Sequence, residues 1–112
     1  MGSRSTGRKL TMQVLYQMEV RPDQSLDTIL NEHIQKKDYE LNTSEWTCTT
    51  SLKTWAYRKK ADVIIQEYAK DWDIDRLNLI DKTLLRIALY ELNHTKTPMP
   101  IIIDEILELA KK

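Results

Sequence analysis

Hydrophobic residues recur every three or four positions along most of this chain, which is the spacing of one face of an α-helix. The spacing predicts five main helices joined by short polar connections. We expect them at about residues 6–20, 25–34, 44–70 and 79–94, with the last beginning near residue 101. A run of helices in this order indicates an all-α bundle.

Residues that favour helix ends mark most of these boundaries. Pro22 ends the first helix, because the residue before a proline disfavours the helical conformation. Ser25 is a good N-cap for the second helix. Asn42 and Glu45 have the spacing of a capping box at the start of the third. Two prolines in the segment 97–100 separate the last two helices.

The apolar stripes also predict which side chains form the core. The second half of the third helix carries the most regular stripe, whereas its first half contains a run of poor helix formers at residues 47–50. We expect the following residues to be buried: Leu10, Val14, Leu15, Met18, Leu26, Ile29, Leu30, Ile34, Cys48, Leu52, Trp55, Ala56, Ala61, Ile64, Ile65, Tyr68, Ala69, Trp72, Leu84, Ile87, Ala88, Leu92, Ile103, Ile106, Leu107 and Ala110. Trp46, near the start of its helix, is a candidate surface anchor.

Composition supports a folded helical domain. The chain has 112 residues, of which 41% are hydrophobic and 30% charged, with only two glycines and three prolines. The length is enough for one domain, and the glycines and prolines are too few for the turns of a strand-rich fold. The formal net charge is zero, so any binding to nucleic acid has to come from a local patch. A single cysteine fits the cytoplasm, and the longest apolar run is far too short to cross a membrane.

Catalytic chemistry finds little support in the sequence. There is no glycine-rich phosphate loop, and the two histidines have no cysteine nearby to complete a metal site. Asp71, Asp73 and Asp75 alternate near a turn, but the glycine and final glutamate of a calcium loop are missing. We therefore expect a protein that is not an enzyme and holds no cofactor or metal.

The N-terminal segment is the better candidate for a binding site. Arg4, Arg8 and Lys9 precede the first acidic residue, Glu19, and the two arginines are one helical turn apart. Further along lie Gln13, which can hydrogen-bond a base edge, and Tyr16, which can stack on an unpaired base. This pattern suggests RNA binding. The structural alternative is a charged, frayed terminus in which Tyr16 covers the core.

The sequence between residues 81 and 92, DKTLLRIALYEL, resembles a signature of the NusB family of bacterial antitermination factors. Further residues match the family in the same order: Arg8, Gln13, Leu15, Tyr16, Asp62, Ile65, Trp72, Arg76, Leu77, Asp104, Glu105, Glu108, Leu109, Ala110 and Lys111. The resemblance implies one domain over residues 1–112, built from two packed sub-bundles at about 6–42 and 43–112. It also implies a further C-terminal helix that this sequence lacks. We expect either a longer parent chain or an apolar face open to self-association.

The resemblance further implies a role in ribosomal RNA transcription. The family uses its first helix to hold single-stranded boxA RNA and its C-terminal bundle to dock the ribosomal protein NusE, and the pair joins the elongating RNA polymerase. Asp81 matches an acidic position of that docking surface, with Arg76 and Glu91 as candidates beside it. Each also has a structural interpretation: Asp81 could cap its helix, and the other two could form ion pairs nearby.

Two alternatives remain open. The first is a helical module that self-associates, for example as a homodimer, and has lost RNA recognition. The second is a fragment of an enzyme, since a NusB-like domain also precedes the catalytic domain of a ribosomal RNA cytosine methyltransferase. No sequence resembling such a catalytic domain follows here, which argues against the enzyme.

Overall fold

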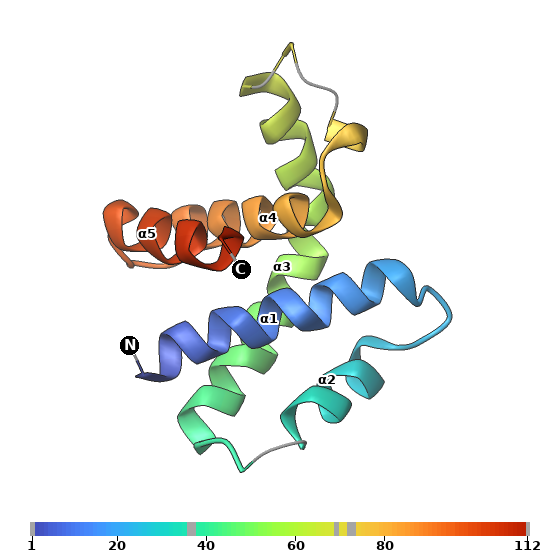
Figure 1. Cartoon of the computed structure of the whole chain (residues 1–112), viewed down its shortest axis with the longest axis vertical. Coiled ribbons are helices and arrows are strands. Elements are labelled where there is room, and N and C mark those ends of the chain that lie inside the picture. Colours follow the sequence, from blue (N-terminus) through green and yellow to red (C-terminus); the bar gives the residue numbers. More distant parts are fainter. Residues whose placement is uncertain (1, 36–37, 69, 72–73, 112) are drawn as a thin grey trace. The chain divides into compact units, whose positions relative to one another are not determined.

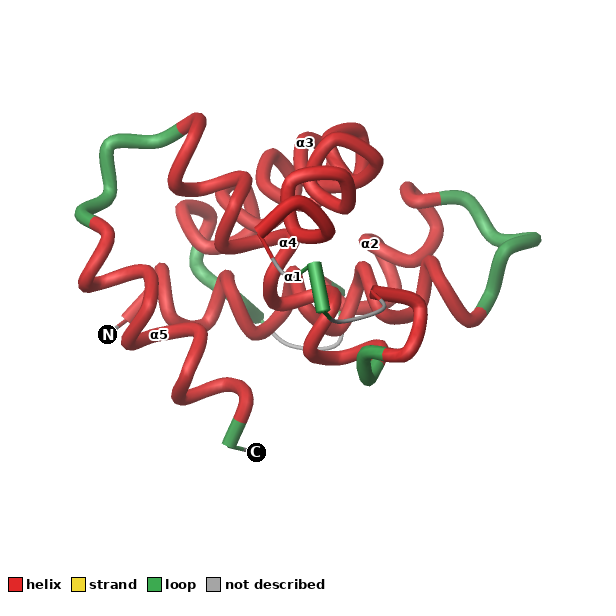
Figure 2. Tube along the Cα trace, turned by 90° about the horizontal axis from the view of Figure 1, so that it is seen from above, coloured by secondary structure: helices red, strands yellow, loops and turns green. Residues whose placement is uncertain are grey.

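The computed structural model describes residues 2–35, 38–68, 70–71 and 74–111, and all regular structure within them is helical (Figures 1 and 2). The elements are α1 (Gly2–Val20), α2 (Leu26–Ile34), α3 (Leu41–Tyr68), the short 3-10 helix η1 (Ile74–Arg76), α4 (Leu79–His94) and α5 (Met99–Ala110). The expected all-α fold is confirmed. Within the described residues, no helix is both long and apolar enough to span a membrane.

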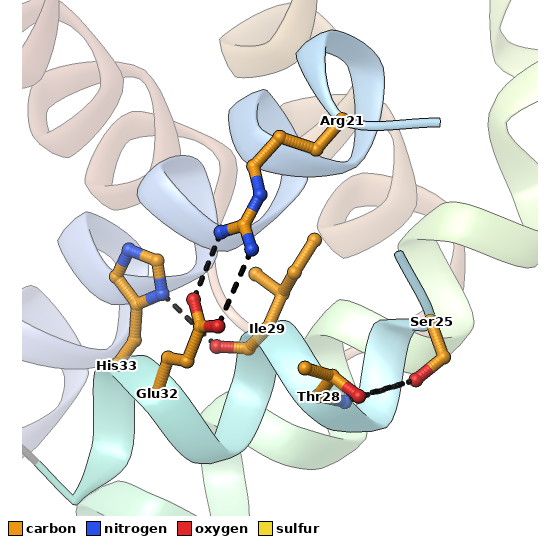
Figure 3. A network of polar contacts seen from close by, with 6 residues as sticks. All are labelled: Arg21, Ser25, Thr28, Ile29, Glu32 and His33. Carbon is orange, nitrogen blue, oxygen red and sulfur yellow. Dashed lines mark hydrogen bonds and ion pairs between the residues drawn. The ribbon is translucent and has the colours of Figure 1, made fainter. Parts of the chain in front are cut away.

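Local signals placed some helix ends correctly and others wrongly. Ser25 caps α2 as expected, because its Oγ accepts a hydrogen bond from the Thr28 backbone N–H at 3.1 Å (Figure 3). The capping box at Asn42 is wrong. The Ser44 N–H already donates to the Glu40 carbonyl at 3.0 Å, so Asn42 lies inside the first turn of α3. At α5, the second proline of segment 97–100 lies within the first turn, where its missing N–H costs no helical bond.

The chain folds as two compact units, Met1–Lys53 and Thr54–Lys112. The division lies within α3, eleven residues beyond the expected boundary at 42/43 (53 against 42). The helix itself is continuous across it.

In the first unit, α1 and α2 pack around a small apolar core. Val14 on α1 and Ile29 and Leu30 on α2 are buried, and they are surrounded by the partly buried side chains of Met18, Leu26, Ile34 and Cys48. A bidentate ion pair joins the end of α1 to α2: Arg21 donates to the two carboxylate oxygens of Glu32 at 2.9 and 3.3 Å (Figure 3). Both side chains are substantially exposed, so the pair adds little to stability.

In the second unit, a partly buried ion pair accompanies the apolar core. The core residues are Ala61, Ile65, Leu84, Ile87, Tyr90 and Ile102, from α3, α4 and α5. Arg86 on α4 donates from Nε and Nη2 to the carboxylate of Asp62 on α3, at 2.8 and 2.7 Å. The Arg86 side chain is only 8% exposed, so this bond lies where water screens it poorly.

Several of the expected core residues are wrong, because their side chains are exposed. Leu52, Tyr68, Leu92, Ile103 and Leu107 are 48%, 87%, 39%, 44% and 55% exposed, and Ala56 and Ala110 are exposed as well. In α5 the buried position is instead Ile102, fully buried, with Ile106 half-buried one turn later. Apolar residues lie nearly all round this helix, so their spacing did not specify which side faces the core. Ala69 and Trp72, two more expected core residues, lie outside the described residues.

Two adjacent isoleucines test the orientation of α5. Ile102→Val is expected to lower the free energy of unfolding by about 1 kcal/mol, because it removes one buried methyl group. The matched variant Ile103→Val is expected to change it by less than about 0.5 kcal/mol, since that side chain is already largely in water. Urea titration of the two variants checks this, and equal losses would contradict the orientation described here.

Candidate nucleic-acid interface

The candidate RNA-binding residues of α1 separate into two groups. Arg4 and Arg8 are four residues apart and lie on one side of the helix. Their guanidinium carbons are 5.3 and 5.4 Å from the ring centroid of Trp46 on α3, within the first unit. Both distances fall within the range of a cation–π interaction. Trp46, expected as a surface anchor, is half-buried and packs against these arginines.

Burial changes the role of one of the two arginines. Arg4 is exposed and remains available to a phosphate group. Arg8 is only 2% exposed. Little of the Arg8 side chain faces solvent, so the predicted contact with a phosphate would require this side chain to move outward. Its contact with Trp46 makes Arg8 part of the packing of the first unit.

Gly7 makes the close packing of Trp46 possible, which the sequence analysis missed. A Cβ atom at Gly7 would lie 2.5 Å from Cε3 and 3.0 Å from Cζ3 of the indole ring. Carbon atoms of different residues do not approach so closely without displacement. A glycine in the middle of a helical pattern is costly unless something requires it, and that signal could have revealed the contact.

The other three candidate residues share a different face of α1. Lys9, Gln13 and Tyr16 follow one another at spacings of four and three residues, so their side chains lie in one row. The direction of this row differs from that of Arg8 by about 100°, the rotation per residue of an α-helix. Lys9 is exposed, while Gln13 and Tyr16 are half-buried. We call Lys9, Gln13 and Tyr16 the α1 row.

The candidate partner-binding residues also differ in accessibility. Asp81 is exposed in the first turn of α4. It does not cap this helix, because the N-cap is Asn78, whose Oδ1 accepts from the Ile80 N–H at 2.8 Å. Arg76, in η1, is exposed as well. Glu91 is fully buried, which corrects its assignment to a docking surface.

The single cysteine is poorly suited to nucleophilic chemistry. Burial, with a smaller contribution from the negative charge of Asp27, raises the pKa of the Cys48 thiol. The thiolate is the reactive form, so a raised pKa keeps Cys48 in its unreactive state at neutral pH. Among the described residues, no three potential metal ligands lie together.

Comparison with known proteins identifies what this chain is similar to. The model of the NusB family matches residues 5–112. The transcription antitermination protein NusB of Elusimicrobium minutum is 33% identical over 116 residues, an alignment that covers 100% of this chain and 81% of that protein. NusB from T. maritima has a TM-score of 0.88 at 31% identity, covering 96% of this chain and 76% of that one.

A further solved structure holds the antitermination factors NusB and NusE in complex with dsRNA. It matches with a TM-score of 0.86 and covers 97% of this chain and 81% of that one. The identity is 22%, so this likeness shows the fold alone.

Proposed function

This chain belongs to the NusB family, and we propose that it acts in transcription antitermination as a non-catalytic factor that binds single-stranded boxA RNA. The observation that carries the proposal is the α1 row, in which a cation, an amide and an aromatic ring lie on one face. Lys9 and the exposed Arg4 supply contacts for phosphates, Gln13 for a base edge and Tyr16 for stacking. Such a role would place the protein beside the transcribing polymerase, in the cytoplasm.

We infer that NusE is its protein partner and that the pair joins the elongating RNA polymerase. The NusB protein in the complex with NusE and dsRNA shares the fold of this chain. On the second unit, Asp81 and Arg76 are accessible residues that could face NusE. Glu91 is fully buried, and we leave it out of the proposed docking surface.

Fluorescence anisotropy with a labelled boxA RNA, with and without NusE, tests the RNA site. Tyr16→Ala is expected to weaken binding about tenfold, since base stacking on an aromatic ring contributes about 1–3 kcal/mol. Tyr16→Phe keeps the ring and should stay close to the wild type. Lys9→Ala should lower the slope of log affinity against log salt by about 0.7, the effect of one phosphate contact on a single strand.

Lys96→Ala is the matched control for Lys9→Ala, because it removes one exposed charge from the second unit. If the Tyr16 and Lys9 variants of a folded protein bound boxA RNA as the wild type does, the α1 row would not be the RNA site. A salt-independent affinity would contradict the phosphate contacts in particular.

One observation favours the alternative of a self-associating module. Six large apolar side chains of α4 and α5 are at least 39% exposed: Ile80, Leu92, Met99, Ile101, Ile103 and Leu107. Exposed apolar residues in such number can support contact between copies. A dimeric mass by light scattering, together with no RNA binding at any protein concentration, would favour this function over the first.

A further inference from the structure

The middle of α3 carries a run of basic residues that the α1 row does not involve. Between Glu45 and Asp62 the chain has four basic residues and no acidic one. These residues are Lys53, Arg58, Lys59 and Lys60. The carboxylate of Asp62 is engaged by Arg86 at 2.7 and 2.8 Å, so it is directed to α4 and not to these lysines. Lys59 and Lys60 are exposed and lie about 100° apart around the helix, whereas Arg58 lies about 200° from Lys60, on the opposite side.

A shallow, mostly apolar hollow lies beside Lys59 and Lys60, in the second unit. It has a volume of about 430 Å³ and is lined by Tyr57, Lys59, Lys60, Val63 and Ile64. We call it the α3 hollow. Val63 is 60% exposed, and both lysines are exposed. Lysine stems can line an apolar surface while their ammonium groups stay at its rim, in water.

Contacts with α4 hold the aromatic wall of the hollow in place. The Tyr57 ring meets His94 edge-on, with centroids 4.8 Å apart and planes at 78°. His94 in turn stacks on Tyr90 at 5.1 Å and 11°. Asn93 Nδ2 donates a hydrogen bond to the Tyr57 hydroxyl at 3.2 Å. Tyr57 is therefore ordered before any ligand arrives, which reduces the entropy lost on binding.

We propose that the α3 hollow is a second binding site for single-stranded RNA, made of different residues from the α1 row. A nucleotide joins a flat, largely apolar base to a phosphate, and the hollow joins apolar walls and an aromatic ring to two flanking cations. All lining residues lie within two turns of α3, a length of about 10 Å. That length suits one or two nucleotides better than an acidic helix, which docks in a longer groove.

The test uses the whole chain and a labelled 20-nucleotide oligouridine, with anisotropy measured at two salt concentrations. The double variant Lys59→Ala/Lys60→Ala is expected to bind about tenfold more weakly, and its salt slope should fall by about 1.4, for two lost contacts. Lys70→Ala/Lys111→Ala removes the same charge from other exposed positions and should leave the affinity near that of the wild type. Val63→Glu, which places a like charge beside the phosphates, should weaken binding without removing a lysine.

Repeating the measurement with Lys9→Ala/Tyr16→Ala present separates this proposal from the α1 row. If oligouridine still binds in this background, and if that binding is lost when Lys59 and Lys60 are replaced, the α3 hollow is its binding site. This conclusion holds whether or not the α1 row binds boxA RNA. Equal affinities for the Lys59/Lys60 variant and its charge-matched control would overturn the proposal. A second result would also overturn it: a 20-residue polyglutamate peptide binds in a way that depends on Lys59 and Lys60, while RNA binding does not depend on them. The hollow would then be a protein-docking surface.

Discussion

Asp62→Ala is expected to lower the free energy of unfolding by about 3 kcal/mol, the lower end of the range for breaking a buried ion pair. The variant removes the carboxylate that accepts from Nε and Nη2 of Arg86. The guanidinium stays in a site where it is only 8% exposed, and it loses two charge-assisted hydrogen bonds there. The loss stays at the lower end because the Asp62 side chain is 29% exposed. Urea or thermal unfolding of the variant measures it.

A second bidentate ion pair, in which Arg21 donates from both terminal nitrogens, provides the control. Glu32→Ala breaks the bidentate contact with Arg21, but these side chains are 43% and 34% exposed. It is expected to cost less than about 1 kcal/mol. A double-mutant cycle of Asp62→Ala and Arg86→Ala isolates their coupling from other contacts of the arginine. If Asp62→Ala lowered the free energy of unfolding no more than Glu32→Ala does, burial would not strengthen the bond between Asp62 and Arg86.

Gly7→Ala is expected to destabilise the protein by about 2 kcal/mol, although alanine is the better helix former by about 1 kcal/mol. The added methyl carbon would lie 2.5 Å from Cε3 of Trp46. Either the indole or α1 has to move, and the movement disturbs the stacking of Arg4 and Arg8 on the ring. Chemical denaturation followed by circular dichroism gives the change.

Removing the obstacle should reverse the sign of this effect. In a Trp46→Val background, Gly7→Ala is expected to be neutral or to stabilise the protein by up to about 1 kcal/mol, since only the helix propensity remains. Lys9→Ala on the exposed side of α1 should stay within about 0.5 kcal/mol of the wild type. A loss of the same size with and without the indole would show that the clash is not its cause.

The candidate site was only partly readable from the sequence. The spacing of Lys9, Gln13 and Tyr16 placed them on one face, because helical periodicity alone determines which residues share a face. Periodicity does not say which face is covered by another element. Nothing in the sequence distinguishes Arg8 and Glu91 from charged residues that are exposed. In the structure, however, they are only 2% and 0% exposed.

The sequence by itself determined the five helices and the cap at Ser25, because helix propensity, proline geometry and capping act over only a few residues. Tertiary structure alone decided three other features. They are the burial of Ile102 instead of Ile103, the pairing of Arg86 with Asp62, and the need for glycine at position 7 beneath Trp46. Each depends on residues from different helices, 24 positions apart for the ion pair and 39 (46 − 7) for Gly7. Local pattern carries no information about which distant side chain fills the adjoining space.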